Sequence, residues 1–328
     1  MTSSAGGSWT GNEVEQTNAD GITGTTDGGY TVGTDADWNE GSDPYLSMCF
    51  KAAGSQNTFN VNTGDPDMDV GYAAWADTGL ASGTITPTAC SVNQKAGFSI
   101  MKWVGTGSAD TVPHGLGARA DFVNIKACDS AQDWVAFHRG CGQTGGSGGE
   151  PDDYYVQLNM EATATSSNYW GTGGVTSDVF GLNGSSNTQN SSGATYVGYI
   201  WRNMPGLQHF GGYVGTGREG NYITLDFKPA LLWIKSWAGV TGAWTAYSTA
   251  MNSVGNETTS YIIKPNTDGS AVTSTDEVCL MSNGFFINCT HNDVNGSGGT
   301  GGTSANYIYC AWSGEALQSV YGKGWNAN

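Results

Sequence analysis

Short runs of apolar and β-branched residues alternate with polar turn clusters along most of this chain. No long segment places apolar residues at the spacing of a helix face, and glycines interrupt every candidate helix. Clusters of Gly, Asn, Asp, Ser and Thr separate the apolar runs, which is typical of an all-β sandwich or barrel. The runs predict strands at 98–104, 122–126, 134–137, 196–201, 222–227, 231–235, 261–263 and 307–312.

The apolar pattern occurs twice, with a period of about 110 residues. Val104–Gly107 recurs as Val214–Gly217, and Thr195–Trp201 recurs as Asn306–Trp312. Several such elements keep their order and nearly constant spacing, which chance does not explain. The repeat therefore predicts an all-β fold with two tandem homologous β-sandwich units. The predicted boundaries are 97–204 for the first unit, 205–316 for the second and 317–328 for a C-terminal tail.

Residues 1–96 are predicted to form a partial β unit followed by an extended connector. Gly29–Trp38, followed by Tyr45–Phe50, resembles the strand, polar loop and aromatic strand that end each full unit. Two strands alone leave a hydrophobic face and open edges, so they are marginal in water. We expect this segment to pair with a neighbouring copy of the chain by β-augmentation.

The tryptophans divide into two groups under the repeat. Trp134 matches Trp244, and Trp201 matches Trp312, so all four are expected in the core because both units must fill the same interior. The remaining candidates lack a counterpart and are predicted to lie on contact surfaces, where tryptophan offers a large area at low entropy cost. These surface-contact candidates are Trp170, Trp237 and Trp325.

Composition and charge exclude several classes of protein. The chain has 51 glycines and only 12 basic residues against 29 acidic ones, giving a net charge of −17. Such a chain repels phosphate backbones and anionic lipids, so neither nucleic acid nor a membrane is an expected partner. No run of apolar residues is long enough for a membrane-spanning helix.

The seven cysteines are predicted to remain thiols for the most part. Their number is odd and no CxxC pair occurs, which argues against a zinc site and against a complete disulfide framework. Thiols fit synthesis in a reducing cytoplasm. Cys279 and Cys289 are the most plausible exception, because they are expected on consecutive strands.

Reaction chemistry has few candidates, and we predict that the protein is not an enzyme. His114 lies in a predicted turn, whereas His138 lies near Asp133, with which a proton relay is conceivable. No histidine pair has metalloenzyme spacing, and the pattern GxSxG occurs only inside the glycine tract Gly142–Gly149, which no helix signal follows. No catalytic residue and no cofactor is therefore predicted.

A calcium loop is the metal site that the spacing favours over other acidic clusters. Asp65, Asp67 and Asp69 alternate between two glycines, and alternating carboxylates in a loop can converge on Ca²⁺. The loop lacks the distal glutamate of an EF-hand. A polar turn between strands is the favoured alternative.

Three segments carry a resemblance to a known group of proteins. The sequence resembles that of an uncharacterised tandem-repeat β-domain family in three segments, Ile85–Ile100, Val112–Gly117 and Ser130–Val135. That family occurs in virion proteins of marine and cyanobacterial tailed phages and is tail-fibre-like. The resemblance extends over roughly residues 20–316, although the second unit has Ile223–Asp226 in place of the His114–Gly117 turn.

The resemblance implies a virion structural protein, made in a bacterial cytoplasm and located in the particle. A tail fibre or surface appendage that attaches to the host is the first expectation, with a host glycan as a possible ligand. A capsid decoration protein is the alternative, and a polysaccharide-degrading fibre enzyme is a second alternative. Expected partners are other virion proteins and further copies of this chain, with a trimer as the predicted oligomer.

Overall fold

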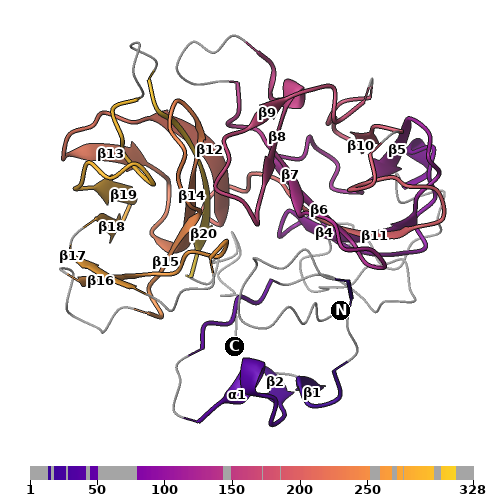
Figure 1. Ribbon diagram of the computed structural model, residues 1–328, viewed down its shortest axis with the longest axis horizontal. Coiled ribbons are helices and arrows are strands. Elements are labelled where there is room, and N and C mark those ends of the chain that lie inside the picture. The colour runs from indigo at the N-terminus through magenta and orange to yellow at the C-terminus, as the bar shows by residue number, and fades with distance from the viewer. Residues whose placement is uncertain are drawn as a thin grey trace.

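The computed structural model describes residues 14–15, 18–26, 29–41, 45–50, 80–142, 149–171, 173–184, 186–251, 259–267, 272–275, 277–298 and 304–314. Almost all of its regular structure is β-strand, which confirms the all-β prediction (Figure 1). Within the described part, the one α-helix is α1 (Ala36–Asn39), and single 3₁₀ turns occur at Leu80–Ser82 and Pro151–Asp153. We call residues 97–204 the first half and residues 205–316 the second half.

One large antiparallel sheet is built mainly from the first half and has the strand order β3-β4-β11-β6-β7-β8-β9. Its strands are β3 (Ala89–Asn93), β4 (Phe98–Val104), β6 (Phe122–Ala127), β7 (Val135–His138), β8 (Tyr154–Gln157), β9 (Thr165–Ser166) and β11 (Thr195–Trp201). A small sheet pairs β5 (Asp110–Pro113) with β10 (Val179–Leu182).

The second half forms a large sheet of order β12-β20-β14-β15 and a small sheet of order β13-β19-β18. The large sheet consists of β12 (Gln208–Val214), β14 (Pro229–Ala238), β15 (Thr245–Ser248) and β20 (Asn306–Ser313). The small sheet consists of β13 (Asn221–Thr224), β18 (Val278–Met281) and β19 (Gly284–Ile287). A hairpin of β16 (Thr259–Ile262) and β17 (Val272–Thr275) lies beside β15.

The two halves share their strand order and their loop bonds. The order β4-β11-β6-β7 in the first half matches β12-β20-β14-β15 in the second. The Asn190 side chain accepts a bond from the Thr106 amide, and Asn295 does the same for Thr216, at 2.9 Å in both cases. These matches favour the predicted repeat. That the halves are two tandem units stays a prediction.

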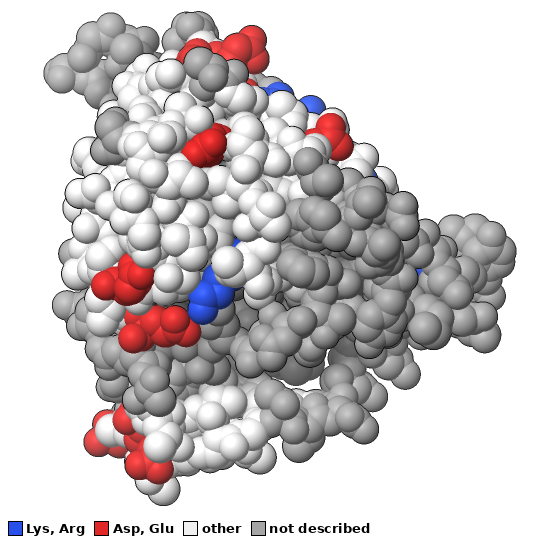
Figure 2. Space-filling model, turned by 90° about the vertical axis from the view of Figure 1, so that its right-hand side faces the viewer, with Lys and Arg blue, Asp and Glu red and all other residues white. Residues whose placement is uncertain are grey.

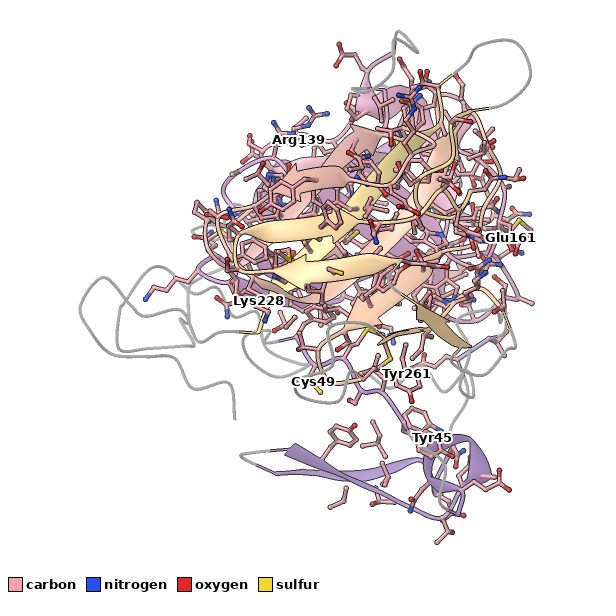
Figure 3. All side chains as sticks on the ribbon, turned by 90° about the vertical axis from the view of Figure 1, so that its left-hand side faces the viewer. Tyr45, Cys49, Arg139, Glu161, Lys228 and Tyr261 are labelled. Carbon is pink, nitrogen blue, oxygen red and sulfur yellow. The ribbon has the colours of Figure 1, made fainter. Side chains whose placement is uncertain are left out.

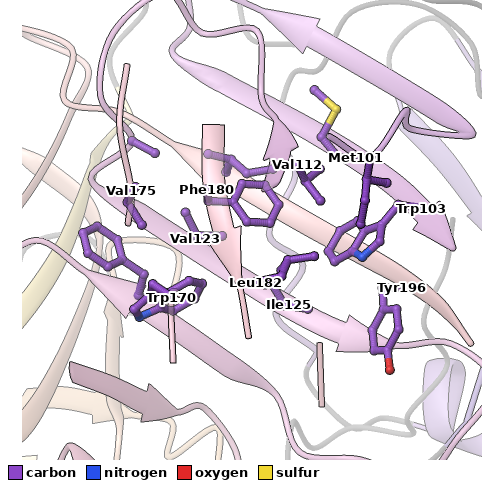
Figure 4. Close-up of a cluster of buried hydrophobic side chains, with 14 of the residues drawn as sticks. Met101, Trp103, Val112, Val123, Ile125, Trp170, Val175, Phe180, Leu182 and Tyr196 are labelled. Carbon is purple, nitrogen blue, oxygen red and sulfur yellow. The ribbon is translucent and has the colours of Figure 1, made fainter. Parts of the chain in front are cut away.

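Alternate side chains along each strand of the two large sheets point into different cores. The four sheets of the two halves therefore stack in the order small, large, large, small. In β11, Tyr196 and Ile200 point into a core shared with the small β5-β10 sheet, whereas Trp201 points to the opposite side. Figure 4 shows the first of these cores, where Trp103, Phe180 and Leu182 meet between the two sheets of the first half. The second half has a corresponding outer core around Tyr307 and Phe285.

A third core lies between the two large sheets and joins the halves. Phe122 stacks near Phe210 at a centroid distance of 5.7 Å, and Trp201 meets Trp312 edge-on at 6.1 Å. We call the side chains that are buried between the two large sheets the shared core. It also includes Trp134, Trp233, Trp237 and Trp244. The prediction that Trp134, Trp244, Trp201 and Trp312 are buried is confirmed. The interior that they fill lies between the halves.

The surface-contact prediction is wrong for two tryptophans. Trp170 is fully buried in the outer core of the first half, where its ring meets Phe137 edge-on. Trp237 is buried in the shared core against Tyr154. Both lack a repeat counterpart because they fill space at places where the halves differ. Trp325 lies outside the described residues.

The N-terminal segment differs from the predicted half unit. β1 (Ile22–Thr26) and β2 (Gly29–Val32) form a two-stranded hairpin, but Tyr45–Phe50 is not a strand. The Phe50 ring instead contacts Trp312 at 5.2 Å and Trp201 at 5.4 Å. The apolar side chains that were expected to need a neighbouring copy are thus partly covered by the shared core of their own chain.

Candidate functional site

Two buried histidines have the same hydrogen-bond pattern. The Nδ1 atom of His138 accepts the Gly140 amide at 3.0 Å, and its Nε2 lies 3.1 Å from the Tyr309 carbonyl oxygen. His114 accepts the Leu116 amide and reaches the Thr176 carbonyl oxygen, both at 3.2 Å. With Nδ1 as acceptor, Nε2 carries the proton and donates.

Burial keeps both imidazoles neutral. It lowers the pKa of His138 to about 3 and the pKa of His114 to about 4. The suggested relay between His138 and Asp133 is not formed, because Asp133 accepts bonds from Gln157 and Asn159 instead. These histidines therefore connect strands, and the His138 bond joins the two large sheets.

Two lysines at matching places of the repeat are also buried. The Lys235 ammonium donates to the carbonyl oxygens of Gly242 at 2.7 Å and Glu161 at 2.8 Å. Burial lowers the pKa of Lys235 to about 8. Lys126 donates to the Ala127 carbonyl oxygen at 2.9 Å, and burial lowers its pKa as well. The bond to Glu161 is a further link between the halves.

All seven cysteines are thiols, as predicted for most of them. The exception proposed for Cys279 and Cys289 is wrong, since no disulfide joins them. Burial raises the pKa of the Cys141 and Cys310 thiols in the shared core. A raised pKa leaves the thiol protonated and poorly nucleophilic at neutral pH.

Acidic residues in the described ranges bind basic side chains and backbone amides. Asp121 accepts a bond from Arg139 at 2.7 Å, and Asp293 accepts one from Lys264 at 2.8 Å. Over the same ranges, no three His, Cys, Asp or Glu side chains are grouped so that they could hold a metal ion. The calcium candidates Asp65, Asp67 and Asp69 lie outside those ranges.

A shallow hollow of about 320 Å³ lies on the large sheet of the first half. It is lined by Val14, Glu15, Lys102, Cys128, Asp129 and Thr195. Burial raises the pKa of Cys128 to about 11, so this thiol is protonated at neutral pH. One lysine, two carboxylates and a protonated thiol form no recognisable catalytic arrangement, so this hollow does not indicate a reaction or a ligand.

The outer side of the small sheet in the second half carries a row of apolar residues, of which Tyr222 is exposed and Phe286 and Cys279 are partly buried. Register pairs Tyr222 with Phe286 and Phe286 with Cys279, so the three side chains lie next to one another across the strands. We call these three residues the aromatic row. Tyr222 is 43% exposed, and its hydroxyl donates to the Asn283 side chain in the adjoining turn. Sequence reasoning missed this row because it weighed tryptophans alone.

The rest of the described surface carries scattered acidic groups and few basic ones. Figure 2 shows red carboxylates dispersed over one face, with less blue from basic groups among them. None of the described helices has the length and hydropathy to cross a bilayer.

Comparison with known proteins places the chain in one family. No curated protein matches it, and no solved structure matches it. A family model described as a domain of unknown function, DUF7483, matches residues 7–316. The match includes both halves and most of the N-terminal segment, and the chain therefore belongs to the DUF7483 family.

Proposed function

We propose that this protein is a structural component of a tailed-phage particle, a tail fibre or another surface appendage that serves assembly and host attachment. The sequence support is the resemblance carried by Ile85–Ile100, Val112–Gly117 and Ser130–Val135. Further copies of the chain, as a trimer, and other virion proteins are the proposed partners.

One structural observation carries the proposal. The buried histidines and lysines are the side chains best suited to proton transfer or nucleophilic attack. Their nitrogen atoms instead form hydrogen bonds with backbone carbonyl oxygens of the same chain. His138 joins one large sheet to the other in this way at 3.1 Å, and Lys235 joins β14 to the segment between β8 and β9 at 2.8 Å. Such bonds favour a rigid building block, because each fully satisfied buried polar group specifies one packing arrangement.

Locating the protein in purified particles tests the proposal. Particles from a culture that expresses the gene would be treated with gold-labelled antibody against the purified protein and viewed by electron microscopy. Gold at the tail or on fibres is expected, and antibody preabsorbed with the protein is the control. Gold spread over the shell would identify a capsid decoration protein instead, and particles free of the protein by mass spectrometry would contradict both assignments.

A further inference from the structure

We propose that the aromatic row of Tyr222, Phe286 and Cys279 binds an uncharged oligosaccharide by stacking sugar rings on the two aromatic side chains. This inference rests on the proposed attachment function, for which it supplies the binding site and the ligand class. The row lies on the outermost of the four layers. Figure 3 looks onto this side of the molecule, with the three strands of the small sheet at the front of the view.

The strand register separates the two sides of this sheet. Ile223, Phe285 and Leu280 form the adjacent cross-strand row and point into the outer core of the second half. Tyr222 and Phe286 alternate with them and point outward. Side chains directly opposite on neighbouring strands have Cβ atoms about 5 Å apart, so Tyr222 and Phe286 project from adjacent points on the outer side of the sheet.

The first half shows that the fold does not require aromatic residues at these positions. There, register places Thr111 opposite Gly181, in the place of Tyr222 and Phe286. That site is also closed, because a Cβ atom on Gly181 would collide with the Trp170 carbonyl oxygen. The edge of β5 is covered by Ile85, whose amide donates to the Thr111 carbonyl oxygen at 3.0 Å.

The second half thus has large aromatic side chains at places where the first half has small and covered residues. Met281 on the same sheet is 43% exposed, like Tyr222. Tyr222 and Met281 face water and Phe286 is partly exposed, while the inward row already fills the core. A contact with something outside the chain explains why they are there.

Size favours a small ligand over a second protein. Three strands of four residues present a face of about 10 by 13 Å, or roughly 130 Å². A stable protein interface buries about 800 Å² on each partner, several times more. A short oligosaccharide fits a face of this size.

Chemistry favours an uncharged sugar. The three strands, Asn221–Thr224, Gly284–Ile287 and Val278–Met281, contain no charged residue. Binding sites for small molecules combine apolar and aromatic surface with a few polar groups that fix orientation. Thr224, two residues from Tyr222 on β13, and Asn283, which accepts a bond from Tyr222, are exposed and provide hydroxyl and amide groups for sugar hydroxyls.

The test is binding of the full-length protein to an array of maltohexaose, cellohexaose, hexa-N-acetylchitohexaose and mannohexaose, all uncharged, followed by titration calorimetry on any sugar that binds. We expect at least one to bind, and Tyr222→Ala or Phe286→Ala to weaken its affinity about tenfold, the loss of one stacking contact. Tyr261→Ala is the matched control, because Tyr261 is 40% exposed on β16, away from the row. This control should bind like the unchanged protein.

Three outcomes would overturn the inference: no binding to any sugar, binding that both row variants leave unchanged, or row variants whose main effect is a lower mass by light scattering. The last result would identify the row as a self-association surface. Tyr222→Ala keeps the test valid if Phe286→Ala does not fold, since Tyr222 is solvent-exposed. A protein found in particles that binds no sugar refutes only this inference, whereas sugar binding by a protein absent from particles refutes only the proposed function.

Discussion

His138 and His114 make the stability of this protein depend on pH. The unfolded chain takes up a proton on each imidazole near pH 6.5, but the folded chain does so only near pH 3 and pH 4. Their stabilising contribution is therefore complete above pH 6.5 and is lost as the pH falls toward 4 for His114 and toward 3 for His138. We expect urea unfolding at pH 5 to show a loss on the order of 2 kcal/mol per histidine relative to pH 7.

A His138→Gln variant separates this effect from the titration of carboxylates. The amide can still donate to the Tyr309 carbonyl oxygen but does not titrate, so the variant should lose less stability between pH 7 and pH 5 than the unchanged protein. Equal losses in the two proteins would show that His138 does not contribute.

Residue-level reasoning succeeded for side chains that the repeat duplicates and failed for those it does not. Trp134 and Trp244 were placed in the core because they match, and both are buried. Trp170 and Trp237 were placed on the surface because they do not match, yet they are buried too. A missing counterpart shows only that the two halves pack differently, so it is no signal of exposure.

The loops that follow β4 and β12 depend on one asparagine each. Asn190 accepts the Thr106 amide and Asn295 accepts the Thr216 amide, and both are fully buried. Replacing either with alanine removes the acceptor of a part-buried amide, and the loss of such a hydrogen bond costs about 0.5–1.5 kcal/mol. We expect thermal melting to show similar losses for Asn190→Ala and Asn295→Ala, and a small effect for Asn187→Ala, in the same loop as Asn190. A clear loss in only one of the two would contradict equivalent roles.

The contact of Phe50 with the shared core should stabilise the molecule. Truncating a buried phenylalanine costs about 3–5 kcal/mol, and Phe50 is half-buried, so Phe50→Ala should cost about 1–3 kcal/mol. Chemical denaturation would measure it, with Tyr30→Ala on β2, which is 39% exposed, as the control. No difference between the two variants would show that the N-terminal segment does not stabilise the body.

Most strands could be predicted from sequence, but not how the sheets stack. The strands predicted at 98–104, 196–201 and 307–312 match β4, β11 and β20 closely. Every residue of β6 is buried, because a sheet covered on both sides buries both rows of its side chains. Continuous apolar runs such as Leu231–Ile234 are typical of such strands, so the sequence held a signal for stacked layers. The coil at Tyr45–Phe50 had no such signal, since its position depends on distant rings.

The four layers make the molecule one body with a core between its halves. Six of the seven residues of β20 from Tyr307 to Ser313 lie in the cores on its two sides: Tyr307, Ile308, Tyr309, Cys310, Ala311 and Trp312. Hydrogen bonds add to the apolar contact, for example Trp244 Nε1 to the Gln157 carbonyl oxygen at 2.9 Å. Separating the halves would expose the shared core to water, so neither half is expected to be stable alone.

Differential scanning calorimetry of the full chain and of Phe210→Ala tests this coupling most directly. Phe210 lies in the second half, and its ring packs against Phe122 of the first. We predict one transition whose calorimetric and van't Hoff enthalpies agree, and a variant whose single transition moves as a whole to lower temperature. Two transitions in the full chain, with Phe210→Ala shifting only one of them, would contradict a core shared by the two halves.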